Sequence, residues 1–258
     1  MPLVLVERSD SGVVSITLNR PERRNALSPE LVAELTRAFA TAADEASARV
    51  VVLRGAGEAF CAGGDIDSMR EKANLSEAAT SADAASFIEL FRSVAACPLP
   101  VVARVQGAAL GGGTALAACA DVVVAGRGAI FGCTEVRVGI VPAVVAPHVI
   151  ARIGFSAARR IMLSGERFGA ERALELGLVD SVCDEAELDG VVTTTTLELL
   201  RGHRHAQTAL KALLRQLQAS PASETDAQVL TATVRARMSP EGQRAMAEFM
   251  ASLARREK

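Results

Sequence analysis

Short runs of β-branched and other apolar residues recur along the first 185 residues and are separated by stretches with helical spacing. The runs lie at residues 4–7, 13–18, 49–54, 101–105 and 122–125. Ser28 followed by Pro29 is typical of a helix start and predicts an amphipathic helix to about residue 47, and a second helix is expected over 81–96. Strands that alternate with helices predict an α/β fold.

The β-branched runs become rare after residue 185, and helical spacing takes over. Residues 186–216, 222–238 and 240–256 each have a helical pattern. The sequence therefore predicts two regions, an α/β part over 1–185 that carries the active site and a helical region over 186–258.

The charge balance and the cysteine pattern exclude several classes of function. Lys and Arg number 28 against 30 Asp and Glu, so nothing favours a nucleic-acid or anionic-membrane partner. No stretch is apolar enough to span a membrane, and the opening residues do not resemble a signal peptide. Five widely spaced cysteines favour neither a disulfide framework nor a metal site. A cytoplasmic protein without a metal is expected.

Two segments rich in small residues are candidates for a site built from backbone groups. Residues 59–66 read AFCAGGDI and residues 107–114 read GAALGGGT. Glycines at a helix start let another backbone or a ligand approach closely, and the helix N-terminus favours negative charge. Taken alone, residues 59–66 are better explained as an ordinary connection between strand and helix, and residues 107–114 are also consistent with close packing of a helix on a sheet.

A third segment, residues 131–139, places a single carboxylate among apolar residues. Burial of Glu135 would raise its pKa toward a value useful for proton transfer. The alternative is a surface glutamate that pairs with Arg137, and the local sequence does not choose between them.

Five ordered motifs carry a resemblance that covers most of the chain. Asn19-Arg20-Pro21 with Asn25-Ala26-Leu27 is the first, and the others lie at 59–66, 107–113, 131–142 and 163–179. Together they resemble the crotonase superfamily, the enoyl-CoA hydratase/isomerase family. The segment from Thr134 to Ala143 is most similar to bacterial members assigned as enoyl-CoA or methylglutaconyl-CoA hydratases.

The resemblance implies a crotonase-like spiral of ββα units followed by a helical region that assembles trimers or dimers of trimers. It implies an acyl-CoA substrate, no cofactor besides the coenzyme A of that substrate, and Glu135 as the acid or base. The backbone N–H groups of Ala62 and Gly112 would form an oxyanion hole, in which fixed donors stabilise a thioester enolate. Asp65 would order its loop rather than perform chemistry. The expected substrate and coenzyme-A contacts are Arg23, Arg24, Ala26, Cys61, Gly63, Asp65 and Ile66, with surface solvation an alternative for the two arginines.

One position departs from the family pattern. Well-known hydratases carry a second glutamate where this chain has Ala115. Hydration of a 2-enoyl-CoA remains the first expectation, and isomerisation between 3-enoyl-CoA and 2-enoyl-CoA by Glu135 alone is the alternative. A non-catalytic acyl-CoA-binding or structural subunit is a third reading. Arg137 is a candidate for a distal substrate carboxylate, and His148 is either an auxiliary acid or base or a structural residue.

Overall fold

The computed structural model describes residues 2–71, 76–219 and 225–256. A six-stranded sheet in the order β1-β2-β3-β4-β6-β9 forms its centre. The strands are β1 (Val4–Arg8), β2 (Val13–Leu18), β3 (Val50–Gly55), β4 (Val101–Val105), β6 (Val122–Gly126) and β9 (Ser181–Cys183). β1 is antiparallel to β2, and the remaining neighbours are parallel.

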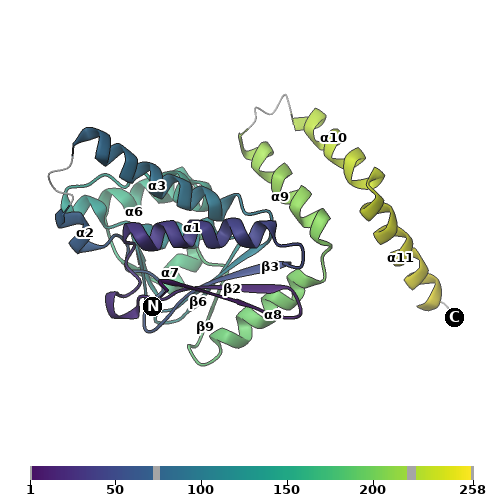
Figure 1. The fold of residues 1–258 in the computed structure, drawn as a ribbon, viewed down its shortest axis with the longest axis horizontal. Helices are drawn as coiled ribbons and strands as arrows, with labels where there is room; N and C mark the ends of the chain where they lie inside the picture. The colour runs from purple at the N-terminus through teal and green to yellow at the C-terminus, as the bar shows by residue number, and fades with distance from the viewer. Residues whose placement is uncertain (1, 72–75, 220–224, 257–258) are drawn as a thin grey trace.

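Both faces of this sheet are buried, which explains why its strands are continuous apolar runs in the sequence. Alternate residues such as Val51 and Leu53 pack into a large core with α1 (Pro29–Asp44) and α3 (Glu77–Ala95). The intervening Val50 and Val52 pack on the opposite face with Leu188 and Val192 of α8 (Leu188–Leu200). Figure 1 shows α1 and α3 on one side of the sheet and α8 on the other.

A second, three-stranded sheet positions the small-residue segments. It has the order β5-β7-β8, formed by Ala108–Leu110, Ile130–Gly132 and Phe168–Gly169. These strands have two or three residues each, too short to produce an alternating pattern, and the sequence did not predict them. β5 leads through Gly111 directly into α4 (Gly112–Cys119).

The remaining helices surround the sheets and extend beyond them. The structure has α2 (Ile66–Glu71), α5 (Ala146–Ile153), α6 (Phe155–Ser164), α7 (Ala170–Glu175), α9 (Arg204–Ala219), α10 (Thr225–Met238) and α11 (Pro240–Arg256), with 3-10 turns η1 (Pro21–Arg23) and η2 (Glu135–Val138). In Figure 1, α10 and α11 form an arm that projects from the main body. No helix in the described ranges is long and apolar enough to cross a membrane.

Most predicted elements are confirmed, with shifted ends. The Ser28 hydroxyl accepts a hydrogen bond from the Leu31 N–H and so caps α1, but this helix ends at Asp44 rather than at residue 47. The helix expected over 81–96 begins four residues earlier, where the Ser76 hydroxyl caps it. The helical pattern over 186–216 is confirmed as two helices, α8 and α9, between which the chain turns at residues 201–203. The proposed division at residue 185 stays a prediction.

Candidate functional site

The two small-residue segments lie against each other. The Cys61 N–H donates to the Ala108 carbonyl at 2.9 Å, and the Leu110 N–H donates to the Cys61 carbonyl at 3.0 Å. A Cβ atom on Gly113 would lie 2.1 Å from the Cys61 carbonyl oxygen, so only glycine fits there without backbone movement. The glycines of residues 107–113 therefore allow the close backbone approach that the sequence indicated.

Gly112, the first residue of α4, supplies an N–H group without a partner. The preceding Gly111 N–H is bonded to the Gly132 carbonyl at 2.7 Å, whereas no acceptor in the described residues bonds the Gly112 N–H. The first N–H groups of a helix have no partner inside the helix and carry its positive dipole end. The Gly112 N–H is therefore available to a ligand, and its role in an oxyanion hole stays a prediction.

The prediction for Ala62 is wrong, because its N–H group is already bonded. It donates to the Arg24 carbonyl at 2.9 Å. The carbonyl of the next residue, Gly63, accepts from the Leu27 N–H at 2.7 Å. In a trans peptide the C=O and N–H groups point in opposite directions, so the Gly64 N–H points away from Leu27. No acceptor in the described part of the chain bonds this N–H, which makes Gly64 the free donor of the loop.

Glu135 stands beside the Gly111–Gly112 turn. Its Oε1 lies 2.9 Å from where a Cβ atom on Gly111 would stand. Its Oε2 is buried and has no hydrogen-bond partner among the described residues. Burial raises the pKa of this carboxyl, and only a bond to its own backbone N–H opposes the shift. A half-buried carboxylate with an unbonded oxygen is suited to accept a proton from a ligand.

Arg137 does not pair with Glu135, so that alternative reading of the segment is wrong. The Arg137 guanidinium donates instead to the Ser164 carbonyl at 3.3 Å. Its side chain also packs on Gly165, where a Cβ atom would stand 2.9 Å from the Arg137 Cγ. Through these contacts η2 packs against the C-terminal end of α6.

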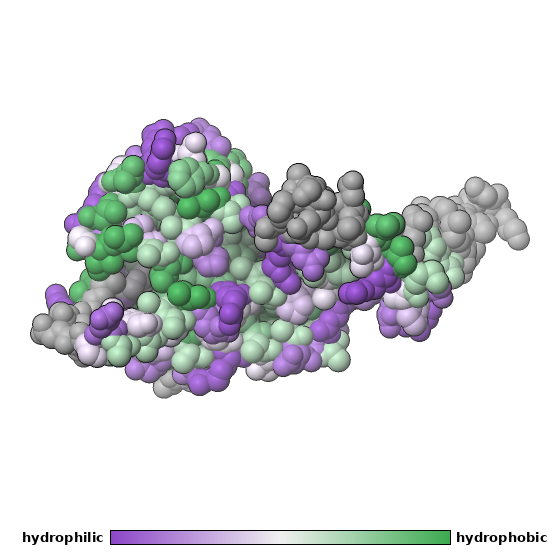
Figure 2. Space-filling model, turned by 90° about the horizontal axis from the view of Figure 1, so that it is seen from above, coloured by the Kyte–Doolittle hydropathy of each residue, from purple (hydrophilic) through white to green (hydrophobic). Residues whose placement is uncertain are grey.

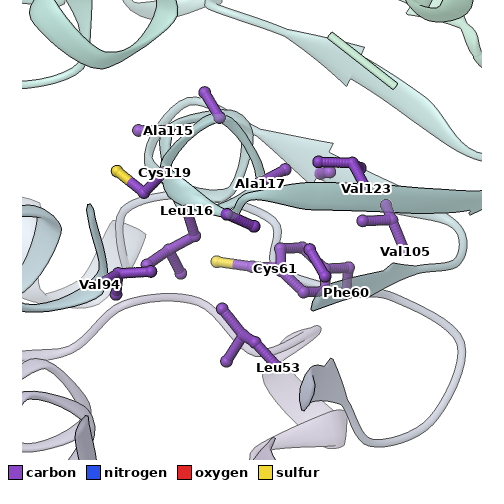
Figure 3. Packing of buried hydrophobic residues seen from close by; sticks show 14 of the residues in the cluster. Leu53, Phe60, Cys61, Val94, Val105, Ala115, Leu116, Ala117, Cys119 and Val123 are labelled. Carbon is purple, nitrogen blue, oxygen red and sulfur yellow. The ribbon is translucent and has the colours of Figure 1, made fainter. Parts of the chain in front are cut away.

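Ala115, at the position of the absent second glutamate, is completely buried. Figure 3 shows it on the side of α4 away from Cys61 and Phe60, whereas Leu116 and Ala117 face them. The nearby Thr114 hydroxyl bonds the Ala109 and Gly132 carbonyls at 2.6 and 3.1 Å. Neither side chain can therefore replace a second proton-transfer group.

Asp65 orders its loop, as predicted. One carboxylate oxygen accepts from the Ser68 N–H at 2.9 Å, and the other pairs with Arg20. Burial opposes ionisation of Asp65, but the bonds from Ser68 and Arg20 outweigh it and lower the pKa. Arg20 and Asn25 belong to the opening motif, yet sequence reasoning gave neither of them a role. The Asn25 side chain bonds the Arg20 N–H and the Ala56 and Ala59 carbonyls.

The remaining predicted contacts fall into two groups. Exposed ones are Arg23, which forms an ion pair with Asp67 at 2.9 Å, Arg24, and Ile66, which is 62% exposed. Ala26, Cys61 and Gly63 are buried. Burial raises the pKa of the Cys61 thiol to about 12, and both its N–H and its C=O are bonded to β5, so no group of Cys61 is free for a substrate.

His148 lies on α5 and packs against the Phe91 ring at 5.5 Å between ring centroids. Burial lowers its pKa, which favours the neutral ring. No hydrogen bond to its imidazole occurs within the described residues. The structure therefore shows His148 in a packing contact with Phe91.

The model of the enoyl-CoA hydratase/isomerase family matches residues 8–251. The chain belongs to this family. Its fold is the predicted crotonase fold, because a solved enoyl-CoA hydratase from Mycobacterium smegmatis superposes with a TM-score of 0.92 at 32% identity, over 98% of this chain and 97% of that one. AtuE of Pseudomonas aeruginosa superposes with a TM-score of 0.91 at 38% identity over 96% of both chains. An enoyl-CoA hydratase from Shewanella pealeana gives a TM-score of 0.93 at 30% identity, over 97% and 94%.

Proposed function

We propose that this member of the enoyl-CoA hydratase/isomerase family hydrates a 2-enoyl-CoA, with Glu135 as its acid-base group. The observation that carries the proposal is the placement of Glu135. Its Oε1 lies against Gly111, next to the Gly112 N–H, and its buried Oε2 has no hydrogen-bond partner among the described residues. A proton acceptor and an anion-stabilising donor at one turn are the two parts that thioester-enolate chemistry requires.

The oxyanion hole of this proposal consists of the N–H groups of Gly112 and Gly64. Gly64 replaces Ala62 because the latter donates to Arg24. The loops that carry the two donors touch, since a Cβ atom on Gly63 would stand 2.8 Å from the Leu110 carbonyl and 3.8 Å from the Gly111 Cα. Fixed donors stabilise charge on the thioester oxygen without reorganisation. One such donor lowers the activation barrier by about 3–4 kcal/mol.

Glu135 would act twice in the reaction. As a carboxylate it removes a proton from water while the water oxygen bonds to C3, and the double-bond electrons move onto the thioester oxygen. The protonated Glu135 then returns this proton to C2 as the enolate collapses, so the product contains one added water. Two of the solved structures that resemble the chain are called enoyl-CoA hydratases, which supports this reaction.

Isomerisation is the second candidate, and Ala115 favours it. A buried methyl group stands where a second carboxylate would be needed to share the positioning of water. One carboxylate suffices to remove a proton from C2 of a 3-enoyl-CoA and return it to C4. The same oxyanion hole would stabilise the intermediate dienolate.

The substrate contacts remain part of the proposal. Arg23, Arg24 and Ile66 are the exposed members of the predicted set and would contact the coenzyme-A portion. Exposed apolar side chains follow Glu135 at Val136, Val138, Ile140 and Val141 and would suit an acyl chain. Figure 2 shows strongly apolar residues gathered on the main body away from the C-terminal arm. Trimeric assembly and a cytoplasmic location stay predictions.

The absorbance of a conjugated enoyl thioester tests the proposal. Loss of absorbance from a 2-enoyl-CoA indicates hydration, whereas a gain from a 3-enoyl-CoA indicates isomerisation. Glu135→Gln should lower kcat by about 10²–10⁴-fold while acyl-CoA still binds. Unchanged turnover in this variant would contradict the role of Glu135, and binding without turnover in the unaltered protein would favour a non-catalytic acyl-CoA-binding subunit.

A further inference from the structure

The Gly64 N–H stands at the end of a chain of hydrogen bonds that begins at Arg20. The Arg20 guanidinium donates to the Ala26 carbonyl at 3.1 Å. The other end of the same peptide, the Leu27 N–H, donates to the Gly63 carbonyl at 2.7 Å. The Gly63 carbonyl belongs to the peptide between Gly63 and Gly64, whose other end is the Gly64 N–H. Two peptide groups therefore connect the Arg20 cation to one of the two proposed oxyanion donors.

Arg20 is itself held in place from two sides. Its backbone N–H donates to the Asn25 Oδ1 at 2.8 Å, and its guanidinium pairs with Asp65. The Asp65 side chain is 5% exposed and the Arg20 side chain 18% exposed, so water screens this ion pair little. Asp65 directly follows Gly64 and caps α2 through the Ser68 N–H, which fixes the chain on the far side of the donor.

The peptide between Gly63 and Gly64 needs such a restraint. Gly63 has a φ of 96°, and neither residue has a side chain that would limit rotation of this peptide. A rotation would turn the Gly64 N–H away from the ligand, but it would also break the bond between Leu27 and the Gly63 carbonyl. Hydrogen bonds in a chain polarise one another, so a cation at one end strengthens the donor at the other.

We propose that Arg20, with Asp65, is a positioning residue that orients and polarises the Gly64 N–H through the Ala26–Leu27 and Gly63–Gly64 peptides. The inference rests on the proposed function, because it assigns a task to the Gly64 donor. Arg20 touches no reacting atom in this proposal. It acts on the developing enolate only through the two peptides.

The test replaces the ion pair without leaving a buried charge. The double variant Arg20→Met/Asp65→Asn removes the cation and the carboxylate together. We expect kcat to fall by about tenfold to a hundredfold with KM changed only a few-fold, because misdirected catalytic groups cost rate rather than ground-state binding. Arg20→Lys keeps the charge at this position and should have a kcat between those of the unaltered protein and the double variant. It is the alternative test variant if the double variant folds poorly.

A spectroscopic readout separates this role from simple stabilisation. The probe is acetoacetyl-CoA, a thioester whose enolate form absorbs differently from its keto form. The unaltered protein should raise the enolate fraction of the bound ligand, and the double variant should lower that fraction at equal saturation.

A matched ion pair elsewhere provides the control. Arg152 pairs with Asp180, has a side chain 15% exposed, and also bonds backbone carbonyls, among them Gly177 at 3.1 Å. Arg152→Met/Asp180→Asn should lower Tm but leave kcat and the enolate fraction unchanged. If Arg20→Met/Asp65→Asn behaves like this control, the inference is overturned while the proposed function stands. If the unaltered protein neither turns over an enoyl-CoA nor raises the enolate fraction, both are overturned.

Discussion

Glu135 is the residue whose protonation state should set the working pH of the site. As a base it must be ionised, and burial raises its pKa above the ordinary value of 4.5. We expect kcat/KM to rise with pH through this raised pKa. As the pH is lowered, activity should therefore be lost at a higher pH than it would be with an exposed glutamate as the base. A pH–rate profile of kcat/KM measures this, and a profile flat down to pH 4.5 would contradict it.

The same shift predicts a pH-dependent effect on stability. Because the folded state holds the proton more tightly than the unfolded state, Glu135 lowers stability as pH rises from 4.5 through the raised pKa. Glu135→Gln should therefore raise Tm above that window and change it little below pH 4.5. The exposed Glu58, changed to Gln, is the control and should leave Tm nearly unchanged at every pH.

Gly112 allows an oxyanion donor to be removed with little damage to its helix. It is the first residue of α4, where proline is tolerated because the N–H has no partner in the helix. A Cβ atom here would meet only the Leu27 Cδ1, at 2.8 Å, and the Phe91 ring at 3.6 Å. Gly112→Pro should lower kcat about 10²–10³-fold relative to Gly112→Ala, which adds the Cβ but keeps the N–H. Equal kcat in the two variants would exclude the Gly112 donor.

At the scale of elements, arginine side chains from the C-terminal helices bind the ends of helices in the main body. Arg204 of α9 donates to the Glu45 carbonyl at 2.8 Å and to the Ala43 carbonyl at 3.1 Å, at the end of α1. Arg204→Ala should lower the free energy of unfolding by about 1–3 kcal/mol, because charged donors to these carbonyls are lost. Urea denaturation measures this change, and kcat should stay the same.

The control for Arg204 is an arginine whose side chain forms an exposed surface ion pair. Arg201 pairs with Glu198 one turn away on α8, and its side chain is 77% exposed. Arg201→Ala should change the free energy of unfolding by less than about 0.5 kcal/mol. Equal losses in the two variants would contradict a specific role for Arg204 at the end of α1.

At the scale of the whole molecule, the projecting arm of α10 and α11 carries exposed apolar side chains. Leu230, Val234 and Met238 recur every four residues along α10 and form one exposed stripe. If the predicted trimer uses this stripe, Leu230→Glu/Met238→Glu should lower the mass measured by sedimentation, since buried charges destabilise an interface. An unaltered protein that sediments as a monomer at all concentrations would contradict the assembly.

Sequence patterns predicted the long elements because each has enough residues to show its period. Strands β2 and β4 match their predicted ranges, and the Ser28–Pro29 start of α1 is confirmed. β5, β7 and β8 escaped prediction because two or three residues show no period and are stabilised only by their sheet partners. The five motifs correctly predicted the family, because their order and spacing are specific even where each segment alone is ambiguous.

The sequence by itself determined that glycines and alanines make up the candidate backbone segments and that Ala115 carries no carboxylate, and its resemblance to the family singled out Glu135 as the acid-base group. Only the tertiary structure decided that, within the described residues, Gly64 rather than Ala62 has a free N–H and Glu135 has an unbonded oxygen while Arg137 bonds the end of α6. The physical reason is that every residue here offers the same backbone N–H. Its direction and its partner depend on which other segment of the chain lies beside it, and that segment, residues 20–27, is some forty positions away in the sequence.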